Sequence, residues 1–95
     1  MSVNDFREQL LKGFWHDLKT HLERDAIIVV NSNLDLSDVA VSLSEDRAGV
    51  VEGWILKSLL VKPSAEQVRA WNGMPTKEFH FLIVQPYVLI QEMAH

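Results

Sequence analysis

The sequence predicts a small α+β domain arranged like a winged helix-turn-helix, in which two crossing helices precede a pair of strands. Residues 34–60 fit two short helices folded across a tight turn. Short runs of β-branched and aromatic residues at 26–30 and 79–84 are bounded by turn-forming residues, which is typical of strands. A chain of 95 residues fits one domain, 1–95, with a single small core.

The first predicted element is an amphipathic helix over residues 3–23. Its apolar residues step by four with charged residues between them, and Ser2 and Asp5 have the spacing of a capping box. The apolar positions are Phe6, Leu10, Phe14, Leu18 and Leu22. The run AIIVV at 26–30 follows, closed by NSN, and predicts a buried strand and a turn.

Two crossing helices are predicted next, separated by the turn SEDRAG. Asp35 or Ser37 can cap the first helix, which runs to about Ser44, and the second helix covers 47–60. The inward side of the first helix is formed by Val39, Ala40 and Leu43. The positions that suit the small residue, the turn and the apolar contact of the crossing are Ala40, Ser44 and Val50.

The last third of the chain predicts a short helix and a strand pair. VKPS ends the preceding helix, and Ser64 with Gln67 can cap a helix over 65–71. That helix is an insertion relative to a winged helix, whose wing strands would be LLVKP and FHFLIV. Pro86 interrupts the second of these segments, and residues 87–93 fit either another strand or a terminal helix.

The charge of the helix pair disfavours DNA recognition. Residues 34–60 carry five acidic residues against two basic ones, Arg47 and Lys57, and the whole chain has a net charge of −4. The acidic residues are Asp35, Asp38, Glu45, Asp46 and Glu52. Apolar residues of the second helix point in nearly all directions, so we expect a core helix buried on several sides, with a partner-covered helix as the alternative. A DNA-binding regulator is the runner-up function, followed by a small metal-binding protein or enzyme.

Signals for catalysis, cofactors or metals are weak. The chain has no cysteine and no nucleophile or phosphate-binding motif, so neither a cofactor nor a catalytic residue is expected. Asp17 and His21 have ligand spacing on a helix beside His16, but a metal site needs a third ligand, and a surface ion pair is the ordinary explanation. The N-terminus does not resemble a signal peptide, and no apolar stretch suits a bilayer, so a cytoplasmic protein is expected.

The segment FLIVQPYVLIQEM predicts an interaction surface. Both faces of its first strand are apolar, so we expect cover on both sides, either from the first helix or from a second chain that pairs with an open strand edge. A twofold homodimer through residues 79–93 is slightly favoured. The candidate interaction residues are Trp54, Lys57, Gln85, Tyr87, Val88 and Leu89. Trp54 is expected to anchor the core, or to contact a partner if it is exposed.

Several motifs together resemble a known bacterial family. They are Trp15, Leu18, His21 and Arg24 at three-residue steps, LDL..VA..L.ED, V..W....LL.KP and FLIVQPYVLIQE. This set is similar to domain-of-unknown-function family 2288 over nearly the whole chain. The resemblance implies a bacterial cytoplasmic protein and transfers no activity, substrate or catalytic residue. The predicted function is therefore a noncatalytic protein-interaction module whose partner is unknown, with a homodimer as one form.

Overall fold

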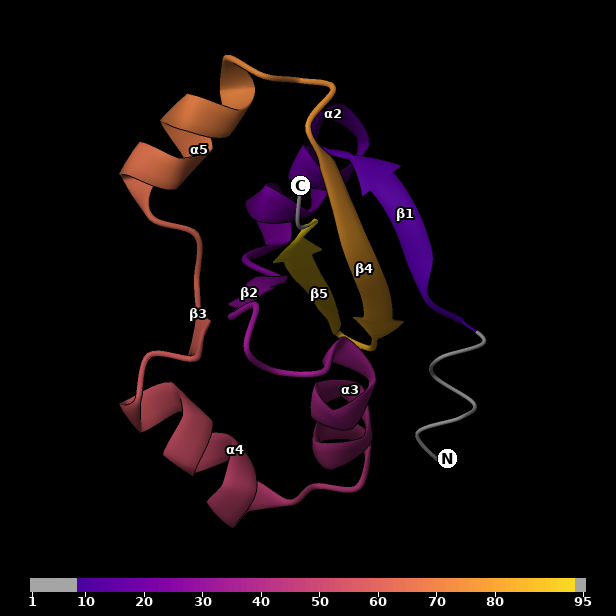
Figure 1. The fold of residues 1–95 in the computed structure, drawn as a ribbon, viewed down its shortest axis with the longest axis vertical. Coiled ribbons are helices and arrows are strands. Elements are labelled where there is room, and N and C mark those ends of the chain that lie inside the picture. Colours follow the sequence, from indigo (N-terminus) through magenta and orange to yellow (C-terminus); the bar gives the residue numbers. More distant parts are fainter. Residues whose placement is uncertain (1–8, 94–95) are drawn as a thin grey trace.

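Residues 9–93 are described by the computed structural model, and they form one sheet with helices on both faces (Figure 1). The strands are β1 (Leu11–Phe14), β2 (Ile27–Val30), β3 (Leu60–Val61), β4 (Glu78–Val84) and β5 (Tyr87–Glu92). The helices are α2 (Trp15–Leu18), the 3-10 helix η1 (Lys19–Arg24), α3 (Leu36–Ser44), α4 (Ala48–Leu56) and α5 (Ala65–Asn72).

The five strands lie in the order β1-β4-β5-β2-β3. Only β2 and β5 run parallel, with Ile28 opposite Leu89, and the other neighbouring pairs are antiparallel. The parallel pair is possible because the chain leaves β2 through α3 and α4 and returns by way of β3, α5 and β4. As a result β4 and β5 lie inside the sheet, while β1 and β3 form its edges.

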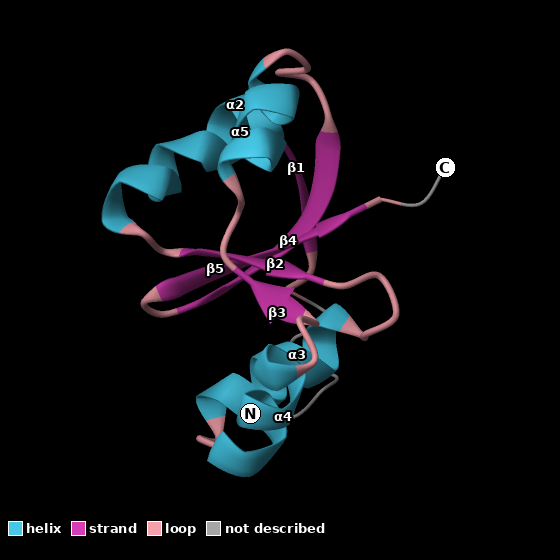
Figure 2. Cartoon of the chain, turned by 90° about the vertical axis from the view of Figure 1, so that its left-hand side faces the viewer, coloured by secondary structure: helices cyan, strands magenta, loops and turns pink. Residues whose placement is uncertain are grey.

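Each face of the sheet carries its own core, because successive side chains of a strand point to opposite faces. In Figure 2, α3 and α4 lie on one side of the sheet, and α2 and α5 lie on the other. The α2/α5 side holds an aromatic cluster in which the Trp15 ring centre lies 4.9 Å from that of Trp71 and 6.0 Å from that of Phe79. On the α3 side, Val39 and Ala40 pack against Leu82 and Leu89. The prediction that strand 79–84 is covered on both sides is confirmed at Phe79 and Leu82, while Ile83 near the end of the strand is exposed.

The helix predicted over 3–23 is wrong in the described part of the chain. Residues 11–14 form β1, which pairs with β4, and the following turns split into α2 and η1. Pairing with β4 overrides the helical spacing, since Gly13 gives the Phe81 ring room to pack against the β1 backbone. The capping box predicted at Ser2 and Asp5 lies outside the described residues, as does Phe6.

The α+β class is confirmed, but the strands proposed for a wing do not pair with each other. β3 pairs with β2, and β4 lies between β1 and β5. The two-helix unit that suggested a winged helix does occur as α3 and α4, joined by a turn in which Asp46 has a φ of 55°. This unit therefore covers one face of a five-stranded mixed sheet.

The predicted caps of α3 and α5 are confirmed, whereas the helix predicted over 47–60 ends at Leu56, after which the chain turns into β3. The Asp35 carboxylate accepts a 2.8 Å hydrogen bond from the Ser37 backbone N–H at the start of α3. Ser64 and Gln67 form the reciprocal capping box of α5. Residues 87–92 form a strand, which settles the choice between strand and helix. Within residues 9–93, no helix is both long and apolar enough to span a membrane.

Candidate protein-binding surface

Helix α4 lies on the outside of the molecule although its sequence is strongly apolar. It begins after Arg47 without a side-chain cap, and the chain leaves it through Ser58, which has a φ of 59°. Only Val51 and Trp54 pack against the α3 core, and both are half-buried. No residue of α4 is fully buried. The expectation of a core helix buried on several sides is therefore wrong for the single chain, because the sheet and α3 meet only one side of α4.

The remaining apolar side chains of α4 are open to solvent. Leu56 is 78% exposed and Ile55 is 55% exposed, and Val50 is also exposed. Val61 of β3 and Tyr87 of β5 are the nearby exposed apolar residues of the sheet. Single exposed apolar side chains are ordinary, but a contiguous apolar patch on a small protein marks an interaction surface. Ile55, Val61 and Tyr87 border the same pocket and form such a patch, which we call the α4 surface.

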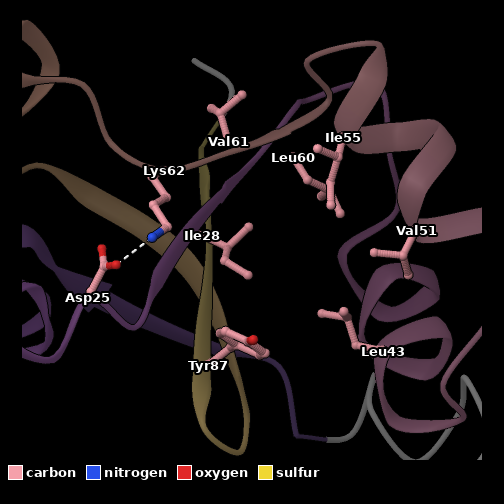
Figure 3. Close-up of a pocket in the computed structure, with 9 residues that line it drawn as sticks. All are labelled: Asp25, Ile28, Leu43, Val51, Ile55, Leu60, Val61, Lys62 and Tyr87. Carbon is pink, nitrogen blue, oxygen red and sulfur yellow. Dashed lines mark hydrogen bonds and ion pairs between the residues drawn. The ribbon is translucent and has the colours of Figure 1, made fainter. Parts of the chain in front are cut away.

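A hollow of about 480 Å³ lies between α4 and the β3 side of the sheet (Figure 3). Ile28 projects into it from β2, Val51 and Ile55 line it from α4, and Tyr87 closes it on the side of β5. The other lining residues are Asp25, Leu43, Leu60, Val61 and Lys62. The volume falls within the roughly 300–1,000 Å³ that is typical of ligand pockets lined mainly by apolar side chains.

The charged side chains that line the hollow lie at one rim. Asp25 and Lys62 form an exposed ion pair there, drawn as the dashed line in Figure 3. Asp25 ends η1 with a φ of 54°, a left-handed conformation that Asp tolerates, and Lys62 directly follows β3. The hollow can therefore take an apolar side chain and offers one charged pair to the backbone or polar groups beside it.

Of the interaction residues predicted from the sequence, three are exposed, and the other three are half-buried or buried. Tyr87 lines the hollow, Lys57 ends α4 in solvent, and Gln85 is exposed in the β4–β5 turn, where the Gln85–Pro86 peptide bond is cis. Trp54 is half-buried against the α3 core, so it contributes to the core from the margin of the α4 surface.

Val88 and Leu89 were expected to contact a partner, but both are buried inside the molecule. Val88 is 2% exposed and Leu89 is 0% exposed, and they point into the cores on opposite faces of the sheet. β5 is also hydrogen-bonded on both edges, to β4 and to β2. A dimer formed by an open edge of residues 79–93 is therefore wrong, because β1 covers β4 and β2 covers β5 within the same chain.

Sequence reasoning missed Ile55, Val61 and the Asp25–Lys62 pair, because their proximity depends on how β3 packs beside β2. One signal was available: a helix with apolar residues on every side and only one side covered must expose the rest.

The groups suggested for a metal do not converge in the structure. His16 and Asp17 are exposed, and the His21 ring is in contact with the Arg24 guanidinium. Among the described residues, no group of three or more His, Asp or Glu side chains is placed to hold a metal ion. His80 faces away from the aromatic cluster, as alternation predicts, and lines a second hollow beside the α3 start, where Asp35 serves as the helix cap.

These features define a class: a small α+β protein with a five-stranded mixed sheet and one uncovered apolar helix. The family model "Protein of unknown function (DUF2288)" matches residues 4–92, and the chain belongs to this family. Its structure is similar to the NMR solution structure of PA1075 from Pseudomonas aeruginosa, with a TM-score of 0.82 and 26% sequence identity. The match covers 95% of this chain and 82% of that one. Among curated proteins, none matches the chain.

Proposed function

We infer that the protein is a noncatalytic module that binds an apolar segment of another protein at the α4 surface. The observation that carries this proposal is the hollow of about 480 Å³ bordered by exposed Ile55, Val61 and Tyr87. Covering it removes apolar area from water, which stabilises a complex by about 25 cal/mol for each Å². An apolar anchor in a pocket, surrounded by a polar rim, is the usual centre of a protein–protein contact.

A DNA-binding regulator has less support than a protein-binding module. The exposed positions of the α3–α4 turn include Glu45 and Asp46, and Arg47 is ion-paired with Glu45. Asp38, in the first turn of α3, is also exposed. Phosphates approaching that turn would meet net negative charge, whereas DNA affinity depends on neutralising phosphates with Lys and Arg.

The test compares two variants that replace similarly exposed apolar side chains on opposite faces of the sheet. Ile55→Asp places a charge on the wall of the hollow, and Met74→Asp places one beyond α5, where the side chain is 49% exposed. Wild-type protein and both variants serve as bait in bacterial extract, followed by titration of purified candidates. We expect a protein that binds the wild type and Met74→Asp directly, and that Ile55→Asp no longer binds.

Capture of the same proteins by all three baits would contradict the proposal. Both variants are first compared with the wild type by circular dichroism, so that loss of binding is not confused with loss of fold.

A further inference from the structure

The side of α4 that faces away from the sheet has a ridge with opposite charges on its flanks. The ridge is the row formed by the Leu56 side chain and the bare backbone of Gly49 and Gly53, and Leu56 is the most exposed large apolar side chain in the described region. A side chain at either glycine would meet nothing within 4 Å, so no intramolecular contact requires a glycine there. Glycine inside a helix nevertheless costs roughly 0.5–1 kcal/mol relative to alanine. A flat strip beside a projecting leucine suits close approach by another helix.

Glu52 and Lys57 lie on the two flanks of this ridge. They are five residues apart, about 140° around a helix, and so cannot reach each other within one copy. Neither forms an ion pair within the described part of the chain. A matching helix that brings a basic group to Glu52 and an acidic group to Lys57 would satisfy both charges.

The second copy of α4 supplies that match, but only when the two helices run parallel. About a twofold axis parallel to both helices, opposite flanks meet, so Glu52 of each copy faces Lys57 of the other. This five-residue offset is the spacing of the g and e positions in a parallel two-stranded coiled coil. In an antiparallel pair the same flanks would meet and like charges would face each other, which is destabilising.

We propose that the protein forms a parallel twofold dimer in which the two Leu56 side chains meet at the axis and each also packs over Gly53 of the other α4. This dimer goes beyond the proposed function, because it uses the outer side of α4 and leaves the hollow beside Ile55 open. A nine-residue helix is about 13.5 Å long, so the contact is small and the dimer depends on protein concentration.

Sedimentation velocity and light scattering of the full chain over a concentration series test the proposal. We expect a monomer–dimer equilibrium that Leu56→Ser abolishes and that Leu11→Ser, at a 50% exposed site on the opposite edge of the sheet, leaves unchanged. Glu52→Lys and Lys57→Glu should each weaken dimerisation by roughly tenfold. The double variant Glu52→Lys/Lys57→Glu should restore it, because the charges again match across the interface.

A wild-type monomer at every concentration would overturn the dimer, and so would a dimer that Leu56→Ser does not weaken. A double variant no tighter than the single ones would overturn the parallel pairing. None of these results bears on the proposed binding at the hollow. That binding is tested separately, by whether Ile55→Asp no longer binds the partner. The two proposals therefore fail independently.

Discussion

At the scale of single residues, the glycines are of two kinds: those that the fold requires and those that it does not. A Cβ on Gly13 of β1 would lie 2.8 Å from Cε1 of the Phe81 ring and 3.7 Å from a methyl carbon of Leu18. A Cβ on Gly53 of α4 would enter open space. The same chemical change is therefore predicted to have opposite effects at the two positions.

We expect Gly13→Ala to destabilise the protein by roughly 1–3 kcal/mol, because the ring and the strand must move apart. We expect Gly53→Ala to stabilise it by about 0.5–1 kcal/mol, because alanine loses less conformational freedom in a helix. Urea unfolding at low protein concentration, where association does not contribute, measures both changes in the free energy of unfolding. Equal effects at the two sites would contradict this difference in their surroundings.

At the scale of elements, local sequence signals correctly predict those caps and strands that do not depend on pairing with a distant segment. The cap at Asp35, the capping box at Ser64 and Gln67, and the strand at 26–30 are each specified by neighbouring residues, and each is found. The sequence predicts a helix at β1 because its apolar residues also fit a four-residue step. Only the pairing of this segment with β4 makes it a strand. The apolar residues on every side of α4 left two predictions open, a core helix or a partner-covered one, since composition indicates how apolar a helix is and not how many of its sides are covered.

β5 is the element whose disruption should be most severe. Val88 and Leu89 lie on opposite faces of this interior strand and are both buried, so a charge at either position would be placed in a closed core. We therefore expect Val88→Asp and Leu89→Asp each to unfold the chain, which circular dichroism and urea unfolding would show as loss of the cooperative transition. A folded monomer from either variant would mean that one face of β5 is open to a partner.

At the scale of the whole molecule, the two faces of the sheet are unequally covered. On the α2/α5 face, Trp15, Trp71 and Phe79 are all buried, and the Trp15 indole N–H donates a 2.9 Å hydrogen bond to the side chain of Asn72. On the other face α3 is well buried, but α4 contributes no fully buried residue. The exposed large apolar side chains of the described region include three on α4, Val50, Ile55 and Leu56, and both proposals use this helix.

The net negative charge of the molecule disfavours binding to nucleic acid. The chain has 13 acidic and 9 Lys or Arg residues, and the α3–α4 unit that resembles a DNA-reading unit exposes Asp38 at the start of α3 and Glu45 and Asp46 in its turn. Arg47 beside them is already paired with Glu45, which leaves few cations to displace counterions from DNA. We expect no submicromolar binding to duplex DNA at physiological salt, as measured by gel shift with random and genomic fragments. A tight, salt-sensitive shift would mean that a different face of the protein meets the phosphates, because this turn would repel them.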